Sequence, residues 1–227
     1  MKNQFLITAV FLGFQTFVSA QIDKNVGDFS SIKTSNRIKV ELIQSTENKV
    51  VVKESQQDAV NITNKNGRLI LKNTLKELVS EDEYSVTIQV YFKEVKEIDA
   101  QGVSYVYSEQ PLVQNHLKAS ANLGSILRLP LQVETLNVSG NTGAKITLSG
   151  SAQESAQLKA SAGAQITANE LKTARNKVVV NSGSTAWATA SNYLDAQVIA
   201  GGKITISGKP KEVKEKVTIG GTIEYVN

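Results

Sequence analysis

The chain has 227 residues, a formal net charge of +4 at pH 7, one histidine and no cysteine. These counts exclude a disulfide framework and a cysteine nucleophile, and they leave His116 as the only imidazole for a Ser-His pair or a metal centre. The small positive charge does not predict a nucleic-acid partner. The densest charged run, residues 209–216, alternates in sign and contains no aromatic residue.

Residues 1–20 have the pattern of a secretory signal peptide. Lys2 precedes an apolar stretch over residues 5–14, and Val18-Ser19-Ala20 provides a small-residue cleavage site before Gln21. The apolar stretch is too short for a membrane anchor, and no later run approaches membrane-spanning length. We therefore expect an exported chain without a transmembrane segment in its mature form. Its location would be the periplasm, the cell surface or the medium, and its lack of cysteine favours a bacterial source.

Residues 21–97 are predicted to be a β-rich part that is continuous with the region over 98–227. Apolar residues alternate with charged ones over 38–42, and the pair Asn66-Gly67 is a strong signal for a two-residue hairpin. Residues 72–83 are the one candidate for a helical turn or a long loop, and a strand is expected to return over 84–92.

From residue 98 to residue 227 a small-residue turn recurs at an almost constant interval. Equivalent positions in successive copies are 102, 123, 143, 163, 183, 201 and 220, which gives intervals of 21, 20, 20, 20, 18 and 19 residues. A fixed period in this range is typical of stacked units that bury their apolar faces against one another. The glycines and asparagines of the turns fit corners that need a left-handed backbone.

The residues after each turn alternate with period two. Ile146, Ile166, Ala186 and Ile204 share one parity and are predicted to form an internal column; Thr147, Thr167, Trp187 and Thr205 share the other and are predicted to face outward. With two short strands per repeat and no room for a crossover helix, the pattern favours an all-β solenoid with parallel coils of about 20 residues. A β-sandwich of antiparallel hairpins is the alternative, because its turns recur every 8–12 residues.

These motifs resemble those of the auto-transporter adhesin head (GIN-domain) family of exported bacterial proteins. The resemblance rests on the export signal, on Asn66-Gly67-Arg68-Leu69-Ile70, on Ile98-Asp99-Ala100-Gln101-Gly102, and on the recurring Ser-x-Gly-x-x-Ile pattern through Gly220. It covers nearly all of the mature chain. It implies a right-handed parallel β-helix similar to pectin-lyase-type solenoids, a role in adhesion, and no catalytic residues.

The repeat region carries few of the groups that catalysis needs. Enzymes that cleave polysaccharides on a β-helix use clustered carboxylates, as acid and base or as calcium ligands. Between residues 135 and 207 the only carboxylates are Glu154, Glu170 and Asp195, and their offsets from the turns differ. We therefore expect neither an enzyme nor a bound cofactor or metal. A carbohydrate-active enzyme and a purely structural envelope protein remain the alternatives to a binding or adhesion module.

Trp187 is the candidate binding residue, since it is the only tryptophan and its parity places it outward between Thr167 and Thr205. Thr185, Thr189 and Tyr193 are the other residues expected around it. An aromatic ring among hydroxyls suits the stacking of a sugar or the anchoring of a cell-surface protein. A covering loop would instead make the ring part of the core. Arg175 and Asp195, at equal offsets from their turns, are predicted to pair on adjacent coils.

Overall fold

The computed structural model describes residues 21–74, 84 and 86–226. The predicted signal peptide and most of the predicted helical turn or loop at 72–83 lie outside these residues. The described chain consists largely of strands, and its helical element is the 3-10 helix η1 (Glu54–Ala59). Across the described ranges, no helix has the length and apolar character that crossing a membrane requires.

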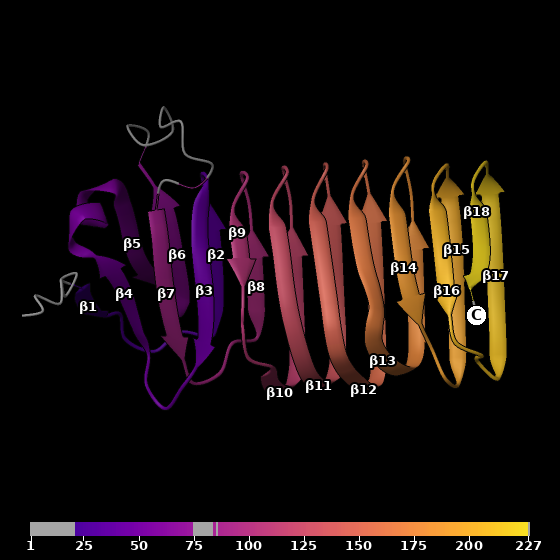
Figure 1. Ribbon diagram of the computed structural model, residues 1–227, viewed down its shortest axis with the longest axis horizontal. Helices are drawn as coiled ribbons and strands as arrows, with labels where there is room; N and C mark the ends of the chain where they lie inside the picture. The colour runs from indigo at the N-terminus through magenta and orange to yellow at the C-terminus, as the bar shows by residue number, and fades with distance from the viewer. Residues whose placement is uncertain (1–20, 75–83, 85, 227) are drawn as a thin grey trace, which may run out of the picture.

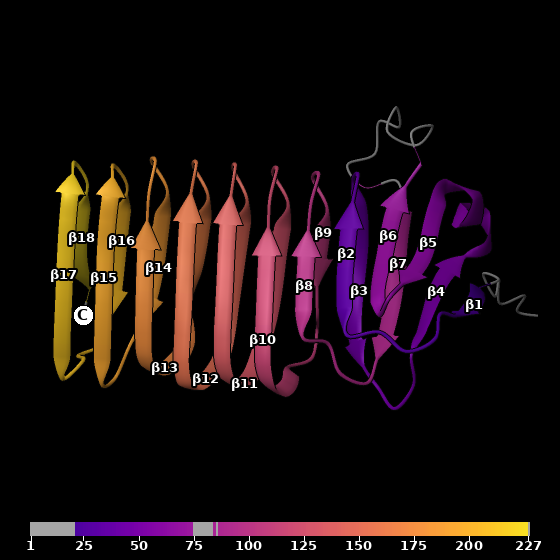
Figure 2. The ribbon, with the colours of Figure 1, turned by 180° about the vertical axis from the view of Figure 1, so that it is seen from behind.

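The repeat region forms parallel coils stacked along one axis, as the sequence predicted (Figures 1 and 2). Every pairing within it is parallel, which rules out the antiparallel sandwich. Its strands are β8 (Glu97–Ala100), β9 (Tyr105–Tyr107), β10 (Leu112–Ala121), β11 (Ile126–Asn141), β12 (Lys145–Ser161), β13 (Gln165–Val180), β14 (Thr185–Thr189), β15 (Tyr193–Ala200), β16 (Lys203–Ser207), β17 (Glu212–Ile219) and β18 (Thr222–Val226).

Each coil contributes one strand to each of two faces. Face A contains the strands that come after the turns, namely β9, the first halves of β11, β12 and β13, and then β14, β16 and β18. Face B contains the strands that precede the turns, namely β8, β10, the second halves of β11, β12 and β13, and then β15 and β17.

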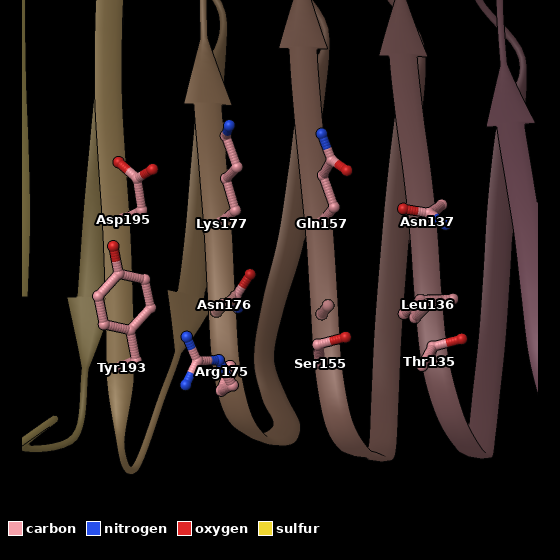
Figure 3. A pocket seen from close by; sticks show the side chains of 11 residues that line it. Thr135, Leu136, Asn137, Ser155, Gln157, Arg175, Asn176, Lys177, Tyr193 and Asp195 are labelled. Atoms are coloured by element: carbon pink, nitrogen blue, oxygen red, sulfur yellow. The ribbon is translucent and has the colours of Figure 1, made fainter.

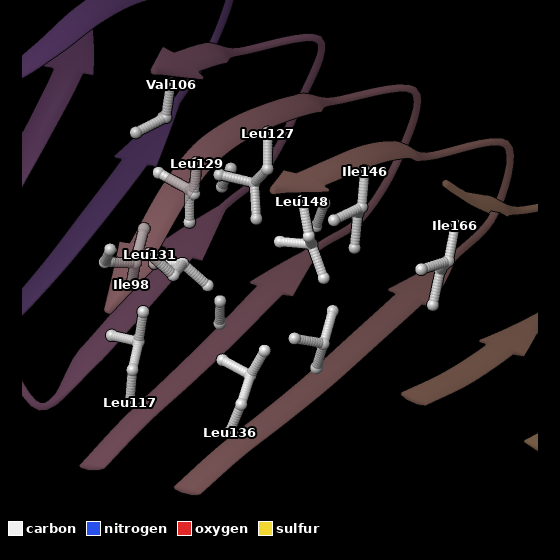
Figure 4. Close-up of a cluster of buried hydrophobic side chains, with 14 of the residues drawn as sticks. Ile98, Val106, Leu117, Leu127, Leu129, Leu131, Leu136, Ile146, Leu148 and Ile166 are labelled. Atoms are coloured by element: carbon white, nitrogen blue, oxygen red, sulfur yellow. The ribbon is translucent and has the colours of Figure 1, made fainter. Parts of the chain in front are cut away.

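The core lies between the two faces and has the predicted column. Ile146 is the register partner of Ile166, Ile166 of Ala186, and Ala186 of Ile204. All four are at most 3% exposed, whereas Thr167 and Trp187 face outward. Figure 4 shows Ile146 and Ile166 on adjacent coils, with Leu148 from the coil of Ile146 and with Leu127 and Leu129 from the coil before it. The predicted parity is therefore confirmed.

The turns consist of two consecutive residues with positive φ, such as Thr142 (49°) with Gly143 (70°). They also bond to one another along the stack. The amide of Gly124 donates to the carbonyl of Thr142 at 3.0 Å, and the amide of Gly143 donates to the carbonyl of Ala162 at 3.0 Å. The small residues of the repeat therefore form a corner whose left-handed backbone conformation few L-residues adopt without strain.

The N-terminal part joins the same stack in an order that differs from the chain order. β2 (Ser31–Ser35) lies between β6 (Arg68–Asn73) and β8, and β3 (Ile38–Gln44) lies between β7 (Val86–Phe92) and β9, all parallel. Figure 1 shows the indigo strands β2 and β3 between the purple strands β6 and β7 on one side and the magenta strands β8 and β9 on the other. The parallel stacking therefore extends into residues 21–97.

Antiparallel strands close the N-terminal end of the stack. β4 (Lys49–Lys53) pairs with β7 and with β1 (Gln21–Asn25), and β5 (Val60–Lys65) pairs with β6. The β5–β6 hairpin turns at Asn66 and Gly67, whose φ values are 53° and 74°. These positive values confirm the two-residue hairpin turn that Asn66-Gly67 predicted.

The parity of the core gives a first prediction. Ile166→Asp should lower the free energy of unfolding by several kcal/mol, because it places an unpaired carboxylate among fully buried side chains. Thr167→Asp, one residue further and outward, should change it by less than about 1 kcal/mol. Chemical denaturation of the two variants checks this, and similar losses for both would contradict the assigned parity.

The corners give a second prediction. A Cβ at Gly202 would lie 2.5 Å from the carbonyl oxygen of Ser184, whereas a Cβ at Gly143 would meet nothing within 4 Å. Gly143→Ala should therefore cost about 1 kcal/mol from its positive φ alone. Gly202→Ala should cost about 1–3 kcal/mol more, because backbone must move to accept the methyl group. Equal unfolding midpoints for the two variants would show that the Gly202 corner is not closely packed.

Candidate functional site

Trp187 lies on the outward side of face A. Its register partners are Thr167 on β13 and Thr205 on β16, as the sequence predicted. The residue is 39% exposed, so no described segment covers it completely. Its indole Nε1 donates a hydrogen bond to Ser207 Oγ on the next coil at 2.7 Å. The bond holds the ring in one orientation while part of it stays accessible.

The other predicted residues divide between the two faces. Thr185 is exposed beside Trp187, opposite Gln165 and Lys203. The hydroxyl of Thr189 donates to the carbonyl of Leu171 and is therefore already engaged. Tyr193 belongs to β15 on face B, because the chain changes faces between β14 and β15. Tyr193 therefore does not join Trp187, Thr167, Thr185 and Thr205 on face A, which together form the Trp187 patch.

Face B carries a shallow hollow that the sequence did not indicate (Figure 3). It has a volume of about 230 Å³ and lies across β11, β12, β13 and β15. The residues that line it are mainly polar: Thr135, Leu136, Asn137, Ser155, Ala156, Gln157, Arg175, Asn176, Lys177, Tyr193 and Asp195. A second hollow of about 200 Å³, lined by Lys118, Asn137, Val138, Ser139, Gln157 and Lys159, shares two of these residues.

The register in this hollow corrects the predicted pair of Arg175 and Asp195. Arg175 lies opposite Tyr193, and Asp195 lies opposite Lys177. The segment from Trp187 to Tyr193 is two residues shorter than the corresponding segment of the preceding coil, Thr167 to Arg175. Residues at equal offsets from their turns are therefore no longer register partners after this point. The two residues share a surface on adjacent strands, but no ion pair joins them among the described contacts.

Different contacts replace that pair. The guanidinium carbon of Arg175 lies 4.8 Å from the centroid of the Tyr193 ring, which is a cation–π geometry. Asp195 is only 8% exposed, and its two carboxylate oxygens accept from Gln197 Nε2 at 2.9 and 3.1 Å. Arg175 and Tyr193 are therefore held against each other, and Asp195 is fixed by its own strand.

A third cluster of polar and aromatic groups lies on face A near the N-terminal end. The rings of Tyr105 and Tyr107 stack with centroids 5.0 Å apart, and Lys39 Nζ lies 5.7 and 5.3 Å from their centroids. Burial, together with Glu41 and Glu109, raises the pKa of the Tyr107 hydroxyl. No single stretch of sequence could indicate this cluster, since Lys39 and the tyrosines come from distant strands.

The carboxylates near the start of the repeat form ion pairs between strands. Glu97 on β8 bonds to Lys118 on β10 at 2.8 Å and to Arg68 on β6 at 3.2 Å. The hydrogen bond from Lys118, followed by the charges of Lys118 and Arg68, lowers the pKa of the Glu97 carboxyl. Within the described residues, no three His, Cys, Asp or Glu side chains gather closely enough to hold a metal ion.

The fold is similar to several solved structures of bacterial proteins. A putative adhesin from Bacteroides fragilis NCTC 9343 has a TM-score of 0.82 and 20% identity, over 91% of this chain and 96% of that one. A putative adhesin from Parabacteroides merdae ATCC 43184 has a TM-score of 0.66 and 21% identity, over 92% and 96%. A putative lipid binding protein from Parabacteroides distasonis ATCC 8503 has a TM-score of 0.67 and 18% identity, over 92% and 96%.

At these identities the likeness concerns the fold. No curated protein matches the sequence. The family described as "Putative auto-transporter adhesin, head GIN domain" matches residues 28–210, which is most of the chain and includes both candidate surfaces up to β16. Two of the similar structures are themselves named as putative adhesins. The chain therefore belongs to the auto-transporter adhesin head GIN-domain family.

Proposed function

We propose that this protein is an exported, non-catalytic adhesion module that binds a glycan on face A through Trp187. The observation that carries the proposal is an indole that is 39% exposed between two threonines on a regular parallel face. Export is supported by the signal-peptide pattern of residues 1–20, and adhesion by the family to which the chain belongs.

The chemistry around Trp187 suits a sugar. An indole ring offers a flat apolar surface for the C–H face of a pyranose, and the hydroxyls of Thr167 and Thr205 both donate and accept hydrogen bonds beside it. The bond from the indole to Ser207 fixes the ring before a ligand arrives. Such preorganisation reduces the entropy that binding would otherwise lose.

Two other functions were open from the sequence, an enzyme and a purely structural envelope protein. The contacts of Glu97 and Asp195 favour neither a general acid nor a nucleophile, since both carboxylates are engaged by neighbours. The two alternatives differ from the proposal in what they predict for purified protein on a glycan array: cleavage for the first and no binding for the second.

Replacing the indole tests the site. Trp187→Ala should weaken binding to a glycan identified on an array by about 1–3 kcal/mol, the range for losing a packed aromatic anchor. It should lower the thermal unfolding midpoint without unfolding the coils, because the residue is only 39% exposed and its bond to Ser207 is lost. Lys145→Gln, an exposed change on the same face two coils away, is the matched control and should alter neither quantity. Full affinity in Trp187→Ala would exclude this site.

The single tryptophan also allows the binding to be read directly. Because Trp187 is the only source of indole fluorescence, acrylamide should quench the emission of the free protein, and a stacked sugar should reduce that quenching. A glycan that binds tightly without changing the quenching must bind elsewhere. That outcome would support glycan binding but would exclude Trp187 as the binding site.

A further inference from the structure

Face B carries a continuous groove that the Trp187 patch does not explain. Its two hollows share Asn137 and Gln157, so together they extend from Lys118 on β10 to Tyr193 on β15. The outward residues along it are register partners on successive strands: Lys118, Asn137, Gln157, Lys177 and Asp195. Four strand spacings give it a length of about 19 Å.

The groove is rich in cations that the protein does not neutralise. Lys118 is paired with Glu97 at 2.8 Å, but no carboxylate in the described chain lies within ion-pair distance of Lys159, Arg175 or Lys177. The one carboxylate in the groove is Asp195, which is nearly buried and bonded to Gln197. The cations without a carboxylate partner therefore outnumber the acid, and an anionic ligand would meet a favourable field.

The groove also offers exposed hydrogen-bonding side chains. The amides of Asn137 and Gln157 face outward on neighbouring strands, and each provides both a donor and an acceptor. Asn176 lies between the outward residues Arg175 and Lys177 but is 2% exposed, and its Nδ2 donates to the carbonyl of Thr189 at 2.9 Å. We therefore do not count Asn176 among the groups that a ligand would contact.

We propose that this groove binds an acidic glycan chain, one that carries carboxylates at regular intervals along a backbone of hydroxyls. The carboxylates meet Lys159, Arg175 and Lys177, and the hydroxyls bond to the amides of Asn137 and Gln157. An acidic peptide fits less well, because strands β12 and β13 under the groove already pair with a neighbour on each side and offer no free edge to a peptide backbone. The hollows here are shallow, and polar residues predominate along their walls.

The proposal is independent of the site on face A. It assigns a second surface with a different ligand charge, and it stands even if Trp187 binds nothing. Trp187 and the groove lie on different faces of the solenoid, so a variant of one leaves the contacts of the other in place. The two proposals can therefore fail separately.

Calorimetry with mannuronate oligomers of two to six sugars tests the groove. The double variant Arg175→Gln and Lys177→Gln should lose about tenfold or more in affinity, since it removes two unpaired cations. The matched control, Lys145→Gln and Lys172→Gln, removes the same charge from exposed positions that do not line the groove, and should bind like the original protein. Affinity should rise with chain length and fall as salt is added.

Several outcomes would overturn the proposal. They are an absence of binding by the original protein, equal losses in the two double variants, equal affinity for neutral glucose oligomers of the same length, and tighter binding of polyglutamate peptide. Loss of mannuronate binding in Trp187→Ala would place the acidic ligand on face A instead. Circular dichroism of both double variants confirms that surface substitutions have not unfolded the coils.

Discussion

The structure depends on a corner of two left-handed residues that hydrogen-bonds to the same corner in the next coil. The second residue of one corner donates its amide to the first residue of the next one, as Arg37 does to Gly102, Val103 to Leu123, and Gly143 to Ala162, all at 2.9–3.0 Å. Each corner uses two residues with positive φ, and these bonds pair the amides that donate them. The strands before and after each corner are then held one strand spacing from the equivalent strands of the next coil. This fixes which side chains of each strand point inward and which point outward.

Fixed parity divides every coil into core and surface. Side chains one residue apart go to opposite sides, so Ile166 belongs to the core and Thr167 to face A. The stack then repeats each outward position at one strand spacing, which turns single residues into rows. On face A a row of hydroxyls is interrupted by Trp187, and on face B rows of amides and cations form a groove. The fold therefore supplies regular surfaces, and individual side chains determine what they bind.

The sequence predicted those features that depend on neighbouring residues. The period near 20, the alternation after each turn and the Asn66-Gly67 hairpin are local, and the structure confirms the column of Ile146 and Ile166 as well as the outward position of Trp187. The corner at Asn36 and Arg37 belongs to the same ladder but contains no glycine, so its composition did not mark it.

Features set by distant contacts could not be predicted in this way. The insertion of β2 and β3 between later strands depends on long-range pairing, which leaves no period in the sequence. The predicted pairing of Arg175 with Asp195 was wrong because the chain takes a shorter path between β14 and β15. The end of the groove at Tyr193 and Asp195 could not be predicted for the same reason, since the register changes between β13 and β15.

The central claim is that each coil advances the chain by one strand spacing with every outward row in register. The absence of cysteine allows spin labels to be placed without background, at Lys118→Cys on β10 and Lys214→Cys on β17. Register partners link these two positions through Asn137, Gln157, Lys177 and Asp195, which makes five spacings. Pulsed electron paramagnetic resonance should give one narrow distribution centred near about 24 Å, broadened only by the label tethers. A broad distribution, or a centre displaced by more than those tethers allow, would contradict the stacked parallel coils.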